Sequence, residues 1–203
     1  MTDEATKHNQ DVYDRIANRY AENRAGRGRS FPDLMDGFLA RLPDGADLAD
    51  LGCGPGRDGG VLARAGHRVA GIDRSAGMLA IAARALPGRA GQGDLRWLPV
   101  ASGSLDGIWC CAALLHVPQD QTVTVLGEMR RVLRPGGHLA LVTALGHGAR
   151  LETVPYAPDR QRWFFYRDPA RLAEQLPAAG LQVLGMTREA GSRDWLRVLA
   201  RAA

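Results

Sequence analysis

Short apolar segments alternate with amphipathic segments from residue 47 onward, and this alternation constrains the fold more than any other feature. Strands are expected at 47–51, 68–72, 105–111 and 138–143, with a weaker one at 89–93. Helices are expected between them, at 57–66, at 75–86 with Ser75 as its cap, and at 119–133. Pro135-Gly136-Gly137 is expected to turn the chain from the last of these helices into the strand at 138–143. Strands and helices that alternate at this spacing form βαβ units, whose parallel strands share a sheet buried on both faces. We therefore predict an α/β fold with a doubly wound, mostly parallel sheet.

The two ends of the chain depart from this alternation. Apolar residues recur at four-residue spacing over residues 11–24, which predicts a helix. A second helix is expected over 31–42, with Ser30 as its cap. A third begins at Asp168-Pro169, and strands at 181–190 and 194–201 follow it. These two strands are joined by a short turn at Gly191-Ser192, so they are antiparallel and complete a seven-stranded sheet with a C-terminal hairpin.

The length of 203 residues fits a single domain. We expect four parts within it: an N-terminal helical cap (1–44), a cofactor-binding core (45–143), a substrate-lid insertion (144–167), and a helix with a hairpin (168–203).

Composition narrows the setting and the partners. No apolar run approaches about 18 residues and the first residues are polar, so neither a membrane span nor a signal peptide is expected. The three cysteines lack a CxxC spacing and form no disulfide framework, which predicts a reduced, cytoplasmic protein. The net charge is +4, but acids and bases alternate along the chain, so a nucleic-acid partner is not favoured.

The richest local signal is the glycine turn Asp50-Leu51-Gly52-Cys53-Gly54-Pro55-Gly56, which follows a strand and opens a helix. Glycines let the backbone turn sharply and approach a ligand closely. Asp73 ends the next strand about 20 residues later, where an acid suits the hydroxyls of a ribose. Arg57 stands where a dinucleotide-binding turn would have its third glycine, and the Asp50 carboxylate would repel a pyrophosphate but attract an amine. The pattern favours a nucleoside that carries an amino acid over NAD.

Four ordered segments carry a family resemblance: ADLGCGPGRD, GID ending at Asp73, GDLRWLPVASGSLDGIWC at 93–110, and EMRRVLRPGGHLAL at 128–141. Together they resemble the class I S-adenosylmethionine-dependent methyltransferases over roughly residues 10–145. The resemblance implies a Rossmann-like sheet, S-adenosylmethionine as cofactor, and an enzyme that transfers its methyl group. It implies cofactor contacts from Tyr20, Asp50, Gly52, Gly54, Asp73, Arg74, Met78, Asp94, Leu95 and Leu115.

Within this resemblance, the Gly52 and Gly54 backbone faces the methionine part of the cofactor, Asp50 helps to fix its amine, and Tyr20 covers that end. Asp73 holds the ribose. Asp50 could instead be a simple turn cap, and Tyr20 could be a residue that packs the helix on the sheet.

At the other end of the cofactor, Arg74 and Met78 flank the adenine, Asp94 meets its amino group, and the Leu95 backbone meets a ring nitrogen. Leu115 is placed where the family's backbone often contacts the cofactor. Asp94 could instead cap a turn, and Met78 could belong to the core.

Two histidines are candidate general bases. His116 and His147 follow the fourth and fifth predicted strands of the core, on the edge of the sheet where ligands bind. An ordinary histidine pKa of about 6.5 suits proton transfer, although either side chain could instead pack beneath its neighbours. No HExxH or similar spacing links the histidines, so no metal is expected.

The acceptor is expected at the N-terminal helices and the 144–167 insertion, where arginines and aromatic residues gather. The candidate substrate-binding residues are Tyr13, Arg24, Arg150, Arg162, Trp163 and Tyr166, with Arg27 and Arg29 as further candidates at the mouth. They favour a small anionic or aromatic acceptor, unless the insertion is a solvated basic loop. No NPPY-like segment follows the fourth strand, and we favour oxygen over nitrogen as the acceptor atom.

Two alternatives stay open. The YDRIANRYAENR segment is also similar to some tRNA-modifying relatives, which would make RNA the substrate. A non-catalytic, cofactor-binding partner protein is the second alternative. The chain is expected to be a monomer or a homodimer.

Overall fold

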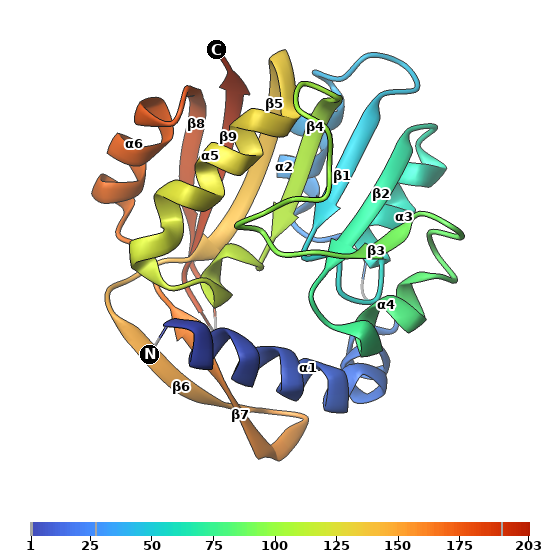
Figure 1. Cartoon of the computed structure of the whole chain (residues 1–203), viewed down its shortest axis with the longest axis vertical. Coiled ribbons are helices and arrows are strands. Elements are labelled where there is room, and N and C mark those ends of the chain that lie inside the picture. The colour runs from blue at the N-terminus through green and yellow to red at the C-terminus, as the bar shows by residue number, and fades with distance from the viewer. Residues whose placement is uncertain (1, 27, 192) are drawn as a thin grey trace.

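A computed structural model of the protein describes residues 2–26, 28–191 and 193–203. Within these residues the main sheet has seven strands in the order β3-β2-β1-β4-β5-β9-β8 (Figure 1). The strands are β1 (Asp47–Leu51), β2 (Arg68–Asp73), β3 (Ala90–Gln92), β4 (Leu105–Cys111), β5 (Leu133–Ala144), β8 (Leu181–Glu189) and β9 (Trp195–Ala202). Neighbours from β3 to β5 are parallel, and β9 is antiparallel to both β5 and β8. The predicted mostly parallel sheet with a C-terminal antiparallel hairpin is confirmed.

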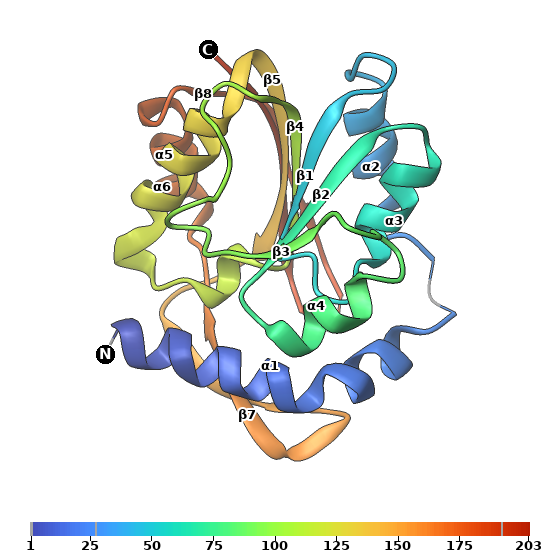
Figure 2. The same cartoon turned by 45° about the vertical axis from the view of Figure 1, so that its right-hand side comes forward.

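Helices cover both faces of this sheet (Figure 2). They are α5 (Thr122–Val132) and α6 (Pro169–Ala178) on one face, and α2 (Pro32–Leu39) and α3 (Arg57–Arg64) on the other. Strand β4 shows how the sequence supplies both cores: Ile108 and Cys110 pack with the first pair of helices, and Trp109 packs with the second. Successive side chains on a strand point to opposite faces, so a continuously apolar strand is buried on both.

The carboxyl ends of the parallel strands lead to the turns that build the site. After β2, the Ser75 side chain accepts a hydrogen bond of 3.1 Å from the Met78 amide and caps α4 (Ala76–Ala82), as the sequence predicted. After β4 the chain makes two short 3₁₀ turns, Leu114–His116 and Gln119–Gln121, before α5 begins.

Two segments far apart in sequence lie across this edge of the sheet. Helix α1 (Thr2–Arg24) runs below the strands, and a separate two-stranded antiparallel ribbon of β6 (Ala149–Val154) and β7 (Ala157–Phe165) packs against it (Figures 1 and 2). The 144–167 insertion, which we expected as a lid loop, is thus a hairpin. Its apolar contacts with α1 join Val12 and Ile16 to Val154 and Ala157.

Several local expectations are corrected by the structure. Ser30 does not cap α2: the cap position is Phe31, which has a left-handed backbone and no capping side chain, while the Ser30 hydroxyl accepts a hydrogen bond from Arg57. Pro135-Gly136-Gly137 does not precede the fifth strand but lies inside it, where the pairing with β4 shifts register. In the described part of the chain, no helix has the length and apolarity that crossing a membrane requires. Ser192, predicted in the last turn, lies outside the described residues.

Candidate active site

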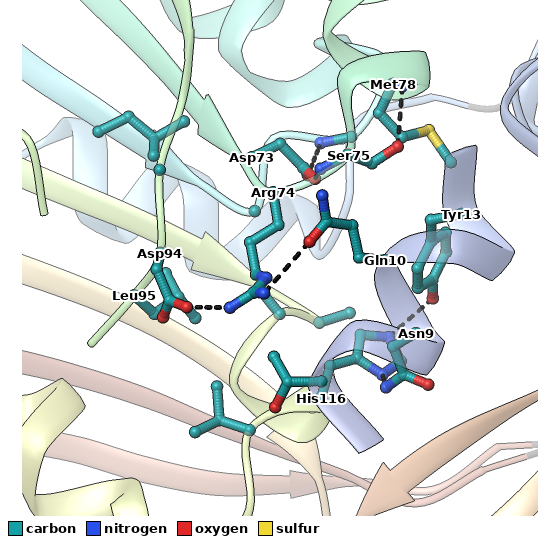
Figure 3. Close-up of a pocket in the computed structure, with 18 of the residues that line it drawn as sticks. Asn9, Gln10, Tyr13, Asp73, Arg74, Ser75, Met78, Asp94, Leu95 and His116 are labelled. Carbon is teal, nitrogen blue, oxygen red and sulfur yellow. Dashed lines mark hydrogen bonds and ion pairs between the residues drawn. The ribbon is translucent and has the colours of Figure 1, made fainter. Parts of the chain in front are cut away.

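A cavity of about 820 Å³ opens between α1 and the carboxyl ends of β1, β2 and β4. We call it the α1 cavity. Ten of the predicted site residues line it: Tyr13, Tyr20, Gly52, Gly54, Asp73, Arg74, Met78, Asp94, Leu95 and His116. Figure 3 shows Asp73, Arg74 and Asp94 on one side of the cavity, with Gln10, Tyr13 and His116 on the other. The sequence therefore predicted most of this wall from separate motifs.

The glycine turn forms the floor of the α1 cavity. Gly52 and Gly54 have φ angles of 69° and 52°, a left-handed backbone that favours glycine. A Cβ on Gly52 would lie 2.2 Å from the Cβ of Ala113, whereas a Cβ on Gly54 would meet no atom within 4 Å. The turn is therefore held tightly from behind and is open toward the cavity, as a loop that receives a ligand along its backbone must be.

Asp73 ties the glycine turn to the turn after β2. One of its carboxylate oxygens accepts from the Gly54 amide at 2.8 Å, and the other accepts from the Ser75 amide at 2.9 Å. Burial raises the pKa of this carboxyl, while the backbone hydrogen bonds oppose that rise. The remaining lone pairs line the cavity, where they suit the two hydroxyls of a ribose.

The predicted adenine end is closed by a network of ion pairs. Asp94 pairs with Arg74, and Arg96 holds the same carboxylate through its backbone and side chain at 2.7 to 2.9 Å. Burial raises the pKa of Asp94, but the bonds from Arg96 outweigh it and bring the pKa below its ordinary value. These bonds use the acceptor positions of the carboxylate. An adenine amino group would reach Asp94 only after one guanidinium moves aside.

Four predicted cofactor residues are buried: Asp50, Met78, Leu95 and Leu115. Asp50 is 3% exposed, and its carboxylate accepts a 2.9 Å hydrogen bond from the Gly59 amide at the start of α3. Burial, with the nearby Asp58, raises the pKa of Asp50 well above its ordinary value. Met78 is buried and also lines the cavity, so it serves the core and the wall together. The Leu115 side chain packs with Ala144 and Phe164 rather than in the cavity, which leaves only its backbone for the predicted contact.

His116 is held on both sides of its ring. Its Nε2 accepts a 2.7 Å hydrogen bond from the Tyr13 hydroxyl, and its Nδ1 lies 2.9 Å from the Trp163 carbonyl. A carbonyl only accepts, so Nδ1 carries the proton. Burial, followed by the nearby Arg162, lowers the pKa of His116 to about 3, and the ring is neutral at ordinary pH.

The same network connects α1 to the hairpin. Arg162 donates a 2.7 Å hydrogen bond to the Tyr13 hydroxyl, whose own pKa burial raises. The Asn9 side chain accepts from the Trp163 amide at 2.7 Å and donates to the Trp163 carbonyl at 3.0 Å. His116, Tyr13 and Arg162 thus form a partly buried chain of hydrogen bonds, in which His116 and Tyr13 line the cavity.

Eight predicted residues do not line the α1 cavity: Arg24, Asp50, Leu115, His147, Arg150, Arg162, Trp163 and Tyr166. His147 is 80% exposed beside Asp168 and lines a different cavity, which it shares with Tyr166. The Arg150 guanidinium lies 5.3 Å from the centre of the Tyr166 ring, and the Trp163 ring stacks on Phe165. The position of His147 therefore gives no support to its predicted role as a base at the ligand-binding edge of the sheet. The hairpin contributes its backbone and Arg162, and its aromatic rings pack on one another and on rings of α1 and of the turn after β4.

A further cavity of about 1150 Å³ lies beyond the glycine turn. Arg24, Phe31, Asp50 and Trp195 are among the residues that line it. Phe31 and Trp195 were not predicted, because the segment before α2 and the start of β9 meet only in the folded chain. Arg27, a further candidate at this mouth, lies outside the described residues.

Comparison with known proteins agrees with this geometry. Residues 49–141, which hold the glycine turn, Asp73, Asp94 and His116, match the sequence profile of a family described as "Methyltransferase domain". This match covers just under half of the chain and supports the resemblance to the class I S-adenosylmethionine-dependent methyltransferases. The predicted cofactor, S-adenosylmethionine, is the methyl donor of that domain.

The similarity to curated proteins is partial. The chain is 44% identical over 121 residues to trans-aconitate 2-methyltransferase of Azoarcus sp. (strain BH72), a match that covers 57% of this chain and 45% of that protein. It is 34% identical over 132 residues to tRNA (carboxymethyluridine(34)-5-O)-methyltransferase of Mus musculus, covering 64% of this chain and 19% of that protein. The matched part of this chain thus spans less than half the length of each relative.

The fold is shared over the whole chain. The solved 1,6-didemethyltoxoflavin-N1-methyltransferase of Burkholderia thailandensis, with bound 1,6-didemethyltoxoflavin and S-adenosylhomocysteine, superposes with a TM-score of 0.78 at 22% identity. That match covers 100% of this chain and 91% of the other chain.

Proposed function

We propose that this protein transfers a methyl group from S-adenosylmethionine to an oxygen atom of a small-molecule acceptor. The observation that carries the proposal is the state of His116, whose two ring nitrogens are both engaged and whose low pKa makes it a weak base. An acceptor that arrives protonated needs a base, and a carboxylate does not, because it is ionised at neutral pH. The site therefore suits an oxygen that is already anionic.

Bound S-adenosylmethionine supplies a methyl group that its positively charged sulfur activates. The residues of this chain position the reactants. The glycine turn receives the methionine part, Asp73 holds the ribose, and α1 with the hairpin covers the reacting atoms from water. Holding nucleophile, carbon and sulfur in line contributes about 7–11 kcal/mol to rate acceleration.

The step balances without a proton acceptor. A lone pair of the acceptor oxygen forms the new bond to the methyl carbon, and the carbon–sulfur bond breaks with its electron pair passing to sulfur. The products are a methyl ester and S-adenosylhomocysteine. A phenol or an alcohol would in addition release a proton, for which Tyr13 offers no outlet, since burial raises its pKa.

The relatives do not decide the acceptor by name. The mouse relative is named for 5-O-methylation of a carboxymethyluridine in tRNA, and the Burkholderia relative is named for an N1 position. The name of the mouse relative makes RNA the second candidate acceptor. Against it, surface arginines such as Arg68, Arg131 and Arg134 are paired with carboxylates rather than left free for phosphates. RNA binding would weaken steeply as salt rises.

The test is a transfer assay with S-adenosylmethionine that carries an isotopically labelled methyl group. The wild type and Asp73→Ala are each incubated with matched sets of small carboxylic acids, phenols and amines. Unmodified tRNA is tested as a further substrate. Mass spectrometry should find labelled methyl esters with the wild type and none with the variant. Labelled amines only, or labelled tRNA only, would contradict the proposal. Tight cofactor binding with no product in any arm would instead favour a non-catalytic partner protein.

A further inference from the structure

We propose that the cavity beyond the glycine turn is the acceptor site, and that it takes a flat carboxylic acid. We call it the Phe31–Trp195 cavity after the two rings in its wall. The inference rests on the proposed function, because it assigns that function its acceptor pocket and substrate class. Trp195 lies outside the segments in which the sequence predicted the acceptor pocket, and Phe31 lies in an N-terminal helical segment but was not among the candidate residues.

The first argument is continuity with the cofactor site. The two cavities share five lining residues: Tyr20, Gly52, Gly54, Cys111 and Ala112. The glycine turn that is expected to face the methionine end therefore lies at the junction. The Phe31–Trp195 cavity has about 1150 Å³ of empty space when the space open to solvent is included, and about 390 Å³ of it can hold the centres of water-sized molecules. The smaller volume falls within the roughly 300–1,000 Å³ of sites for drug-sized ligands. The methionine end and a small acceptor can share this space, and their reacting atoms meet at the junction.

The second argument is the aromatic wall. The rings of Phe31 and Trp195 meet edge to face, with centroids 5.7 Å apart and an interplanar angle of 73°. Both side chains are only partly buried, so each leaves surface for a ligand. Aromatic walls of this kind favour flat ligands, which stack on one ring and meet the edge of the other. The wall thus selects for a planar acceptor.

The third argument is backbone strain. Within the described residues, Phe31 (φ 45°) and Ala112 (φ 56°) are the non-glycine residues with a left-handed backbone, and both line this cavity. A bulky residue in this region is uncommon, and such strain persists where the surrounding structure imposes it, often at ligand sites. Phe31 is strained at the position that brings its ring to Trp195. Ala112 is strained where β4 ends at the junction.

The fourth argument is an arginine without a counter-ion. Arg24, in the last turn of α1, lies 5.5 Å from the centre of the Tyr20 ring, and its buried Nε has no hydrogen-bond partner. Within the described residues, no carboxylate pairs with it. The other arginines of the cavity differ, since Arg29 is held by Asp36 and Arg57 by Asp58. Arg24 is thus the lining cation whose donors are left for a ligand.

The carboxylates of the cavity do not satisfy Arg24. Glu189 pairs with Arg197 at 2.8 Å. Asp58 accepts from Arg57, from the Ser30 amide and from the Trp109 indole. Burial raises the pKa of Asp50, which favours its neutral form. A carboxylate of the ligand would therefore be the ion-pair partner of Arg24.

Two carboxylates could fill this role: that of the acceptor and that of the methionine end of the cofactor. Binding to S-adenosylhomocysteine-loaded protein separates them. The probes are benzoate and trans-cinnamate, with benzamide and cinnamamide as matched neutral controls and cyclohexanecarboxylate as a non-planar acid. Titrations follow quenching of tryptophan fluorescence, and Trp195→Phe identifies the reporter.

The key variant is Arg24→Met, which keeps the length of the side chain and removes its charge. The matched control is Arg19→Met, which removes an exposed, ion-paired arginine of the same helix. We expect Arg24→Met to weaken binding of the flat acids by about 10- to 100-fold, as the loss of a charge-assisted hydrogen bond implies. Arg24→Lys, which keeps the positive charge, should retain part of the affinity for the flat acids. The amides and the non-planar acid should bind the wild type more weakly.

The opposite pattern would overturn the inference. In one such outcome, Arg24→Met weakens the binding of S-adenosylhomocysteine by about 10- to 100-fold and leaves the affinity for 5′-methylthioadenosine unchanged. That result would mean that Arg24 binds the carboxylate of the cofactor. If no flat acid bound the loaded wild type, or if the amides bound as well as the acids, the acceptor class would be wrong. Failure of S-adenosylhomocysteine itself to bind the wild type would be a failure of the proposed function, and calorimetry reports it separately.

Discussion

The Tyr13 hydroxyl donates a hydrogen bond to Nε2 of His116 over 2.7 Å, which occupies the nitrogen that a general base would use. The other ring nitrogen is bound to the Trp163 carbonyl. His116 therefore connects α1, the turn after β4 and the hairpin, and acts as a positioning residue. The proposed reaction agrees with this arrangement, because an ionised acceptor leaves no proton for His116 to remove.

The pH dependence of turnover tests this role. With its pKa lowered to about 3, His116 stays neutral from pH 5 upward, so kcat should not follow a titration near 6.5. His116→Gln should lower kcat, because α1 and the hairpin would be held less firmly over the reacting atoms. The shape of the pH profile should stay unchanged. A wild-type profile that rises through pH 6.5, and loses that rise in His116→Gln, would restore the histidine as a base.

The same shift predicts how stability varies with pH. The ordinary pKa of 6.5 applies to the unfolded chain, which takes up a proton below that pH, whereas the folded chain does so only near pH 3. The stabilisation is therefore complete above pH 6.5 and is lost as the pH falls toward 3, at no more than about 1.4 kcal/mol per pH unit. Urea unfolding is measured at about pH 7.5 and about pH 5. Between these two values the free energy of unfolding should fall more for the wild type than for His116→Gln. Equal losses would argue against the shift.

Gly52→Ala should abolish cofactor binding. Its new Cβ would lie 2.2 Å from the Cβ of Ala113, so the turn must move, and the left-handed backbone costs a further 1–2 kcal/mol or so. Gly88→Ala is the matched control, because Gly88 has φ 67°, open space around it and no place in the site. Calorimetry with S-adenosylhomocysteine should show binding in the control only. Near-normal affinity in Gly52→Ala would mean that the ligand does not use this turn.

Arg74 and Asp94 can be separated by substitution. If the Arg74 guanidinium must leave Asp94 before adenine binds, Arg74→Ala should keep or improve affinity for S-adenosylhomocysteine. Asp94→Ala should weaken it by about tenfold or more, because the charged acceptor for the amino group is lost. A tenfold loss in Arg74→Ala would instead assign the guanidinium to the adenine, as the sequence predicted.

What the sequence predicted well depends on local chemistry. The glycine turn, Asp73 and the Ser75 cap each require a residue type at one backbone position, and the structure has them in place. The apolar run of β4 likewise predicted a strand buried on both faces, and Ile108 and Cys110 pack on one face while Trp109 packs on the other.

What the sequence missed depends on contacts between distant segments. His147 follows β5 as predicted, but the chain turns away there into the hairpin, and the side chain stays exposed. Phe31 and Trp195 are separated by most of the chain and meet only because β9 inserts beside β5. No periodicity or motif in the sequence predicts that Phe31 and Trp195 meet, so the aromatic wall could not be predicted.

The most direct test of the account is calorimetric titration of the wild type and Asp73→Ala with S-adenosylmethionine and S-adenosylhomocysteine, with NAD as a control. The account predicts micromolar binding of both sulfur nucleosides to the wild type, none to Asp73→Ala, and no binding of NAD to either. Binding of NAD, or unchanged affinity in Asp73→Ala, would contradict the assignment of the α1 cavity to this cofactor.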